Sequence, residues 1–268
     1  MVSAAPVAAA PATAPVATSV GGAPILATEG LGKRFGHFRA LSDVTVAFPE
    51  GGITAIIGPN GAGKSTFFNL ISGAFPPSEG RVLFRGRDIT GSPPHHFARM
   101  GIAKSFQITN VFPHLTVREN VRVAAQARRV RFAVFRNRSA YPELTERAEA
   151  LLGEVGLGAR MDRLARELAH GEQRALEIAV ALAAEPSLLL LDEPTAGMSP
   201  EETREMMDLV QRLAETRTLI LVEHKMKLVM GLCRRLVVLH QGQLLAEGSP
   251  DDIRAHPEVR RVYLGKTA

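Results

Sequence analysis

The feature that most constrains this chain is a glycine-rich segment that fits the pattern G-x-x-x-x-G-K-[ST]. It consists of Gly58, Pro59, Asn60, Gly61, Ala62, Gly63, Lys64, Ser65 and Thr66. Glycines let consecutive backbone N–H groups point at one anion, and a helix starting near Lys64 adds the positive end of its dipole. In this pattern Lys64 supplies a charge to the β- and γ-phosphates, and the Ser65 hydroxyl is a ligand for Mg²⁺. The segment predicts polyphosphate binding, but alone it does not separate kinases from nucleotide hydrolases.

The surroundings of this loop favour a strand before it and a helix after it. Ile53–Ile57 is wholly apolar, which is typical of a parallel strand buried on both faces, and a helix is expected over Ser65–Ser72. Short alternating segments with polar turns between them predict a small antiparallel sheet. These segments are Ile25–Leu31, Val44–Phe48 and Arg81–Arg85.

The second half of the chain alternates between helical and strand-like segments, which favours a parallel α/β core. Helices are expected at Gln173–Ala184, Glu201–Glu215 and Lys225–Cys233. Buried strands are expected at Ser187–Leu191 and Thr218–Glu223, and a hairpin is expected from Arg235–Leu239 and Gln243–Glu247. Between the two halves, charged and apolar residues recur at helical spacing, for example over Glu143–Val155, which predicts a mainly helical subdomain.

An acidic pair, Asp192 and Glu193, directly follows the strand expected at Ser187–Leu191. Such a strand delivers its carboxylates to the carboxyl edge of the sheet, where ligands bind in folds of this class. Asp192 is suited to hold Mg²⁺ through water, and Glu193 is suited to polarise an attacking water. The alternative is that the pair only caps a helix.

Composition and length limit the possible classes of protein. The chain has 268 residues, 46% of them hydrophobic, and a formal net charge of +5. That charge suits nucleic acid, an anionic membrane surface or a polyphosphate, and does not choose among them. No apolar run reaches the roughly 18–20 residues of a membrane-spanning helix, so we expect a soluble or peripheral chain. The single cysteine, Cys233, predicts a reducing compartment and an inert, buried thiol.

Two parts of unequal length are expected. Residues 1–24 contain alanine and several prolines but no charge, which predicts a disordered extension. Residues 25–268 are expected to form one domain, with the helical subdomain at about 92–170 and a C-terminal tail at about 248–268.

A segment before the acidic pair, Leu168–Arg174, reads Leu-Ala-His-Gly-Glu-Gln-Arg and reveals a family. Six elements then stand in that family's order: Phe35, the phosphate loop, Gln107, this signature, Asp192-Glu193, and His224 after a later strand. From Ile25 to Gly265 the chain resembles the nucleotide-binding subunits of ABC transporters. The resemblance implies a P-loop NTPase (RecA-like) parallel-sheet core with an antiparallel β subdomain and an inserted helical subdomain.

The resemblance also implies roles for residues that carry little meaning alone. Phe35 would stack on the adenine of ATP, with a core aromatic as the less favoured alternative. Gln107 would contact Mg²⁺ or the attacking water, and His224 would contact the γ-phosphate. The signature would bind the γ-phosphate of ATP held by a second ATPase subunit, so two ATPs would lie between two chains. The signature residues expected to do this are Ala169, His170, Gly171 and Glu172.

This chain departs from the family at two places. The usual signature is Leu-Ser-Gly-Gly-Gln, whereas here Ala169 stands for serine, His170 for the first glycine and Glu172 for glutamine. The loop after Glu193 usually carries an aspartate, and here Ser199 stands there. Both departures suggest unequal ATP sites in a heterodimer, with a homodimer as the alternative.

Two segments indicate a branch of the family. Glu223–Gly231 and the tail His256–Gly265 resemble the LivG-type ATP-binding subunit of branched-chain amino-acid importers. The implied partners are two integral-membrane permease subunits, a second ATPase subunit and an extracytoplasmic substrate-binding protein, with no nucleic acid. The implied location is the cytoplasmic face of the inner membrane, as a peripheral subunit.

Other functions remain open at this point. Urea and short-chain-amide importers and the ATPase of lipopolysaccharide export share the tail. A soluble ABC protein acting on ribosomes or DNA would suit the basic charge, but such chains usually carry two cassettes or a long coiled-coil insertion. A small-molecule kinase leaves the signature, Gln107 and His224 unexplained. The arginines of 128–138 suggest either a contact with headgroups or permease, or a solvated face.

Overall fold

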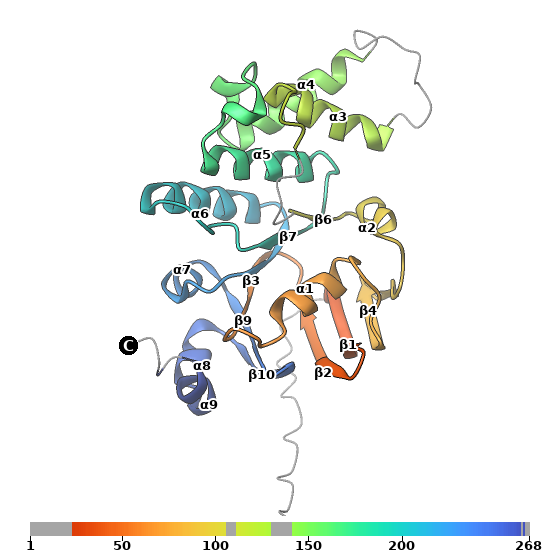
Figure 1. The fold of residues 1–268 in the computed structure, drawn as a ribbon, viewed down its shortest axis with the longest axis vertical. Coiled ribbons are helices and arrows are strands. Elements are labelled where there is room, and N and C mark those ends of the chain that lie inside the picture. Colours follow the sequence, from red (N-terminus) through yellow and green to blue (C-terminus); the bar gives the residue numbers. More distant parts are fainter. Residues whose placement is uncertain (1–22, 106–110, 130–140, 264, 266–268) are drawn as a thin grey trace, which may run out of the picture.

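A six-stranded sheet with the order β10-β9-β3-β8-β7-β6 forms the centre of the molecule (Figure 1). The computed structural model describes residues 23–105, 111–129, 141–263 and 265. The strands are β3 (Gly52–Ile57), β6 (Ile102–Lys104), β7 (Leu188–Asp192), β8 (Thr218–Val222), β9 (Arg235–His240) and β10 (Gln243–Gly248). All neighbouring pairs are parallel except the hairpin of β9 with β10. The predicted parallel core and its terminal hairpin are therefore confirmed.

The central strands are apolar along their whole length because both faces of the sheet are covered. Leu189 and Leu191 of β7 belong to the cluster that includes α5 and α6 side chains. Leu188 and Leu190 belong to the opposite cluster, which includes side chains of α1 and the second sheet. Alternate residues of a strand point to opposite faces, so a doubly covered strand needs an apolar residue at every position.

The second sheet is antiparallel, as predicted, and has the order β2-β1-β4-β5. Its strands are β1 (Leu26–Phe35), β2 (Phe38–Phe48), β4 (Glu79–Phe84) and β5 (Arg87–Asp88). β1 and β2 are longer than expected and continue to a hairpin end, where Phe35 lies opposite Phe38. The hairpin thus carries Phe35 to the rim of this sheet.

Most helices of the described residues pack around these sheets, and α3 and α4 pack on α5. They are α1 (Lys64–Ile71), α2 (Pro94–Met100), α3 (Val117–Arg129), α4 (Pro142–Glu154), α5 (His170–Leu182), α6 (Pro200–Ala214), α7 (Met226–Leu232), α8 (Pro250–Ala255) and α9 (Pro257–Val262). Short 3-10 segments lie at Gly158–Arg160 and Ala165–Glu167. In Figure 1, α3 and α4 lie beyond α5, farthest from the antiparallel sheet.

Two boundaries differ from the sequence expectation. Helix α5 begins at His170 and not at Gln173, because Ala169 and not a residue of the first turn takes the extended N-cap conformation. Strand β6, at Ile102–Lys104, lies within the stretch predicted to be mainly helical, yet it pairs with β7 in the parallel sheet. Three residues carry too little periodicity to reveal a strand of this kind.

Several predictions fall outside the described residues. They concern Gln107, residues 1–22 of the extension, and most of the arginine-rich stretch 128–138. Within the described ranges, no helix combines the length and the apolar character that crossing a membrane requires. Cys233 is buried, as predicted, and burial raises the pKa of its thiol to about 12. The thiol therefore stays protonated, which fits an inert residue.

Candidate functional site

The phosphate loop connects the end of β3 to the start of α1, as the motif requires. Gly58 has a φ of 149°, and a Cβ there would lie 2.1 Å from the Leu239 carbonyl oxygen of β9. Gly242 of the β9–β10 hairpin donates a backbone hydrogen bond to the Ala62 carbonyl, 3.0 Å away. The hairpin therefore supports the loop from behind, and this close approach accepts only glycine at position 58.

The N-terminus of α1 suits an anion. Its N-cap is Gly63, with a φ of 94°, no side chain caps the helix, and no acidic residue lies in its first turn. The first backbone N–H groups of a helix lack intrahelical partners, so this end can accept a phosphate. Lys64 lies inside the loop, where its Nζ donates to the carbonyl oxygens of Gly58 (2.8 Å) and Pro59 (2.9 Å). The Ser65 side chain stands at the exposed first turn beside it.

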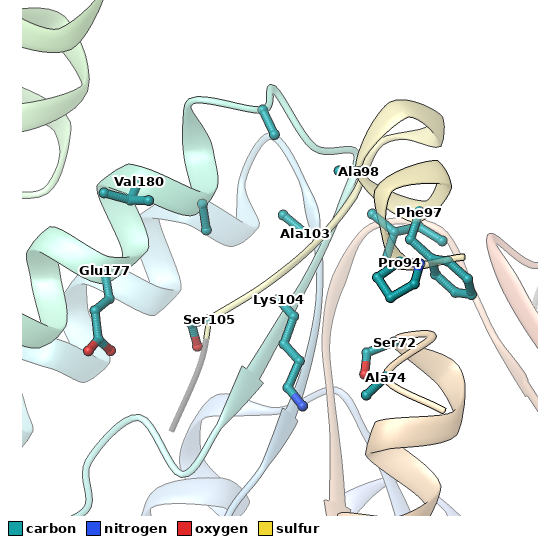
Figure 2. A pocket seen from close by; sticks show the side chains of 13 residues that line it. Ser72, Ala74, Pro94, Phe97, Ala98, Ala103, Lys104, Ser105, Glu177 and Val180 are labelled. Atoms are coloured by element: carbon teal, nitrogen blue, oxygen red, sulfur yellow. The ribbon is translucent and has the colours of Figure 1, made fainter. Parts of the chain in front are cut away.

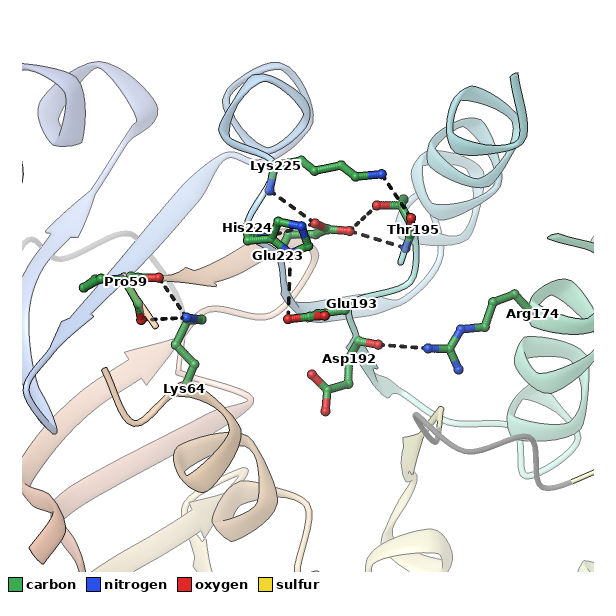
Figure 3. Close-up of polar contacts among 10 residues, drawn as sticks. Pro59, Lys64, Arg174, Asp192, Glu193, Thr195, Glu223, His224 and Lys225 are labelled. Carbon is green, nitrogen blue, oxygen red and sulfur yellow. Dashed lines mark hydrogen bonds and ion pairs between the residues drawn. The ribbon is translucent and has the colours of Figure 1, made fainter. Parts of the chain in front are cut away.

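The acidic pair and His224 converge on this loop from the ends of β7 and β8. Figure 3 shows Glu193 between His224 and Asp192, with Lys64 on the facing side. His224 Nδ1 lies 3.7 Å from Glu193 Oε1. Glu193 has a φ of 44°, a conformation that non-glycine residues rarely adopt and that is concentrated at functional sites. Asp192, Glu193 and His224 therefore share one edge of the sheet with the phosphate loop, and their roles there remain predictions.

Burial shifts the pKa values of two charged groups at this edge of the sheet, Asp192 and Lys64. Burial raises the pKa of Asp192, Lys104 opposes that rise, and the neighbouring Glu193 adds to it. Burial lowers the pKa of Lys64, and the attraction of Glu193 opposes that shift. A divalent cation beside Asp192 would offset the cost of two adjacent carboxylates, and the hydroxyl and carboxylate oxygens of Ser65 and Asp192 are donors that Mg²⁺ prefers. The residues present therefore fit a magnesium ion.

The signature residues lie elsewhere, at the exposed start of α5. Gly171 N donates to Glu202 Oε1 (3.1 Å), and His170 Nε2 lies 3.1 Å from the Ala196 carbonyl oxygen. Glu172 Oε2 accepts from the Ala169 N–H (3.1 Å), and its Oε1 pairs with Arg160 Nε (2.9 Å). Figure 3 shows that Arg174 of the same helix, whose guanidinium reaches the Asp192 carbonyl oxygen at 3.4 Å, lies across the acidic pair from Lys64.

Phe35 stands at the hairpin end of β1 and is 48% exposed, so it is not a core aromatic. Its ring meets Phe75 edge-on with centroids 5.7 Å apart, and Lys33 Nζ lies 5.4 Å from its centroid. These neighbours fix the ring while leaving much of its surface open. Gln107, the remaining predicted site residue, is outside the described part of the chain.

Sequence reasoning missed residues that reach the site from a distance. Lys104 of β6 acts electrostatically on Asp192, and Glu223 is buried beside Thr195. Tyr263, at the end of α9, takes a hydrogen bond from the backbone of Gly58. These contacts join positions far apart in the chain, so no local sequence pattern predicts them. The one available signal for Glu223 was an ionisable residue at the end of a strand expected to be buried.

Comparison with protein-family models gives two matches. The ABC transporter model matches residues 41–196, a range that contains the phosphate loop, the signature and the acidic pair. The model of the branched-chain amino acid ATP-binding cassette transporter matches residues 243–268, which comprise β10, α8, α9 and the tail.

Individual proteins agree with these models. The chain is 41% identical over 252 residues to the high-affinity branched-chain amino acid transport ATP-binding protein LivG of Salmonella typhimurium, covering 91% of this chain and 98% of that protein. A solved ATP-binding cassette of an ABC transporter in its ADP conformation is 33% identical, with a TM-score of 0.78 over 90% of this chain and 98% of the other. A dimeric cassette in a post-hydrolysis state, bound to ADP and Pi, is 26% identical, with a TM-score of 0.70 over 84% and 98%.

Proposed function

This chain belongs to the ABC transporter family of ATP-binding cassettes and is a nucleotide-binding ATP hydrolase of that family, and we propose that it powers the import of branched-chain amino acids through partner permeases. The match of residues 243–268 to the branched-chain amino acid cassette model supports this substrate class, because that segment lies outside the general ATPase motifs. Uptake of urea or short-chain amides and export of lipopolysaccharide are the alternatives.

The arrangement of the site residues supports the following roles. The backbone N–H groups of the phosphate loop and the Lys64 ammonium hold the β- and γ-phosphates. Ser65 and Asp192 would hold Mg²⁺, which when bound would neutralise charge on the phosphate oxygens. Glu193 accepts a hydrogen bond from the attacking water and orients it, and His224 contacts the γ-phosphate from beside Glu193. Phe35 offers its open face to the adenine.

The site of one chain is completed by a second ATPase subunit. The Ala169 and His170 side chains are exposed at the start of α5. Figure 3 shows that Arg174 of this helix lies across the acidic pair from the chain's own Lys64. An exposed helix N-terminus in this position can serve an ATP held by another chain. The departures at Ala169, His170 and Ser199 favour a heterodimer, in which the second subunit carries the other signature.

The permease is expected to use a groove beside β6. This cavity has a volume of about 570 Å³. Figure 2 shows it between α2, β6 and α5, with Phe97 and Val180 among its apolar lining and Lys104 and Glu177 among its polar lining. A groove with these properties suits an amphipathic helix of a membrane partner. Its occupation would place this subunit peripherally at the cytoplasmic face of the membrane.

The observation that carries the proposed hydrolytic mechanism is the convergence of Glu193 and His224 on the phosphate loop. Glu193→Gln removes the base and retains the shape, so ATP hydrolysis should fall by about 100-fold or more. ATP should instead hold a stable dimer, detected by gel filtration and by retained nucleotide. If the variant hydrolysed ATP at close to the wild-type rate, Glu193 would not be the base. Glu201→Gln, on the exposed first turn of α6, is the matched control and should leave hydrolysis unchanged.

The substrate class needs the assembled transporter. The chain, its second ATPase subunit, the permeases and the binding protein are reconstituted in vesicles, and ATP hydrolysis is measured with leucine, urea or neither. Stimulation by leucine alone supports the proposal. Stimulation by urea alone would reassign the substrate and leave the ATPase roles intact.

A further inference from the structure

We propose that Glu223 is a positioning residue for hydrolysis: its buried carboxylate joins the turn after Glu193 to the segment that carries His224, and so fixes the two side chains relative to each other. This inference rests on the proposed roles of Glu193 and His224. Glu223 itself faces away from the phosphate loop in Figure 3 and is only 1% exposed, so it acts through its neighbours.

The carboxylate of Glu223 divides its acceptors between two segments. Its Oε1 accepts from the Thr195 hydroxyl (2.5 Å) and from the Thr195 N–H (3.4 Å). Its Oε2 accepts from the N–H groups of His224 (3.1 Å) and Lys225 (3.4 Å). A buried charge is tolerated when such donors satisfy it, and hydrogen bonds to a charged group are the stronger kind. One carboxylate therefore ties the end of β8 to the residue that follows Pro194.

Thr195 belongs to a tight turn that begins at Glu193. Ala196 N donates to the Glu193 carbonyl oxygen (3.0 Å), and Glu193 N donates to the Val222 carbonyl oxygen (3.0 Å) at the end of β8. The backbone of Glu193 is therefore held from both sides. Because its φ is 44°, it needs such surrounding contacts to persist.

Lys225, on the other side of His224, makes a second connection to the same turn. Its Nζ donates to the Thr195 carbonyl oxygen (3.0 Å) and to the Thr203 hydroxyl in α6 (3.4 Å). Both chain neighbours of His224 thus contact Thr195. A rotation of the His224 backbone would break bonds on both sides, which is why the 3.7 Å approach of His224 to Glu193 is stabilised.

The test is a double-mutant cycle of Glu223→Gln with His224→Ala in the full chain with its second ATPase subunit. Glu223→Gln alone should lower kcat by about tenfold, because displacement of a positioned group commonly costs one to two orders of magnitude. The Kd for ATP, from calorimetry, should stay within about twofold, because Lys64 and α1 are untouched. In the His224→Ala background, Glu223→Gln should lower kcat no further, since it acts through His224. The slow residual hydrolysis of these variants is measured as single-turnover release of radiolabelled phosphate.

A second variant tests the same link from its other end. Thr195→Val removes the hydroxyl that donates to Glu223 and should lower kcat in the same direction, again without weakening ATP binding. Thr28→Val is its matched control, because Thr28 is also buried and its hydroxyl is also hydrogen-bonded, in the antiparallel sheet. It should change the melting temperature and leave kcat unchanged.

The outcomes separate the inference from the proposed function. If His224→Ala alone left kcat unchanged, the proposed role of His224 would be wrong. If His224→Ala lowered kcat while Glu223→Gln and Thr195→Val left it unchanged, the positioning role would be rejected. Equal losses from Glu223→Gln in both backgrounds would also reject it, because they would mark a general structural effect. Histidine NMR gives an independent readout: Glu223→Gln should shift the His224 imidazole signal and leave that of His95, in α2, in place.

Discussion

Helix α1 begins at Lys64, directly after its N-cap Gly63, whereas two glutamates accept hydrogen bonds at the start of helix α5. Both N-termini are proposed to meet phosphate, α1 that of the chain's own ATP and α5 that of the ATP of a second subunit. The end of α1 has no side-chain cap and no acid in its first turn. At α5, Glu172 accepts from the Ala169 N–H, and Glu202 of α6 accepts from the Gly171 N–H.

The difference between the two helix ends predicts different behaviour. A phosphate can dock on α1 without displacing a negative charge, and Lys64 adds an attraction. At α5 the Arg160 guanidinium offsets Glu172, but Glu202 occupies the N–H group of Gly171 that a γ-phosphate would use. We therefore expect ATP to bind first to the phosphate loop of one chain. Closure against α5 of the second chain should be the weaker, adjustable step.

The largest expected effect is that of Lys64→Ala. It removes the only side chain that places a positive charge inside the phosphate loop among the described residues. A charge-assisted contact with phosphate is strong, so ATP affinity of the single chain should fall by about 100-fold or more. Calorimetry measures this directly. An unchanged Kd would show that the N–H groups of α1 suffice to bind ATP. It would also remove the positive charge of Lys64 as a difference between the two helix ends.

The converse change is Gly171→Asp at the other helix end. A Cβ at this position would already lie 3.0 Å from Glu202 Oε1, and an added carboxylate would repel both Glu202 and an incoming phosphate. ATP-dependent dimerisation should weaken by about tenfold or more, because like charges at an interface are strongly unfavourable. ATP binding to the single chain should not change. Ultracentrifugation measures dimerisation and calorimetry measures ATP binding, for this variant and for Lys64→Ala. If Gly171→Asp lost both properties, the two helix ends would not have separate roles.

The two helix ends also differ in how much of each could be predicted from the sequence. Contiguous motifs were predictable, because a strand, a glycine-rich loop and a helix in succession define the α1 site within one stretch of chain. For the α5 site, the sequence predicted which residues take part but not the contacts that they make. The contact of Gly171 with Glu202 joins positions 31 residues apart, and that of Thr195 with Glu223 joins positions 28 apart. Such contacts depend on packing of elements, and neither spacing nor residue type reveals them.

The start of α5 shows the same limit on a local scale. Ala169 is a poor N-cap residue, so the sequence predicts a helix start at Gln173, three residues after the observed start at His170. Glu172, at the third position of the helix, was the available signal, because glutamate there often accepts from the N-cap backbone. The structure contains that contact, from the Ala169 N–H to Glu172 Oε2.

A smaller effect is expected from Glu202→Gln. It removes the negative charge at Gly171 while keeping an oxygen that can accept the same hydrogen bond. Dimerisation should then reach its midpoint at an ATP concentration roughly threefold lower, in line with the modest influence of one charge at a helix end. Glu201→Gln, one residue earlier on the exposed face of α6, is the control and should have no effect. A higher ATP requirement in Glu202→Gln would mean that Glu202 assists closure and does not compete with phosphate.

The smallest effect on nucleotide-dependent behaviour is that of Ala169→Ser, which restores the hydroxyl usual in the family and acts on stability. Ala169 has φ −61° and ψ 162°, nearly the same as Ser199, the N-cap of α6, with φ −61° and ψ 165°. Ser199 Oγ accepts a hydrogen bond from the Glu202 N–H in that geometry, so a serine at 169 can accept from the N–H of Glu172 without backbone strain. An N-cap serine in place of alanine contributes about 1 kcal/mol, or about 2–4 °C in melting temperature for a chain of this size. Ser199→Ala is the matched inverse and should lower the melting temperature by a similar amount. If Ala169→Ser left stability unchanged while Ser199→Ala lowered it, the glutamates over α5 would already satisfy the helix end that a phosphate is proposed to use.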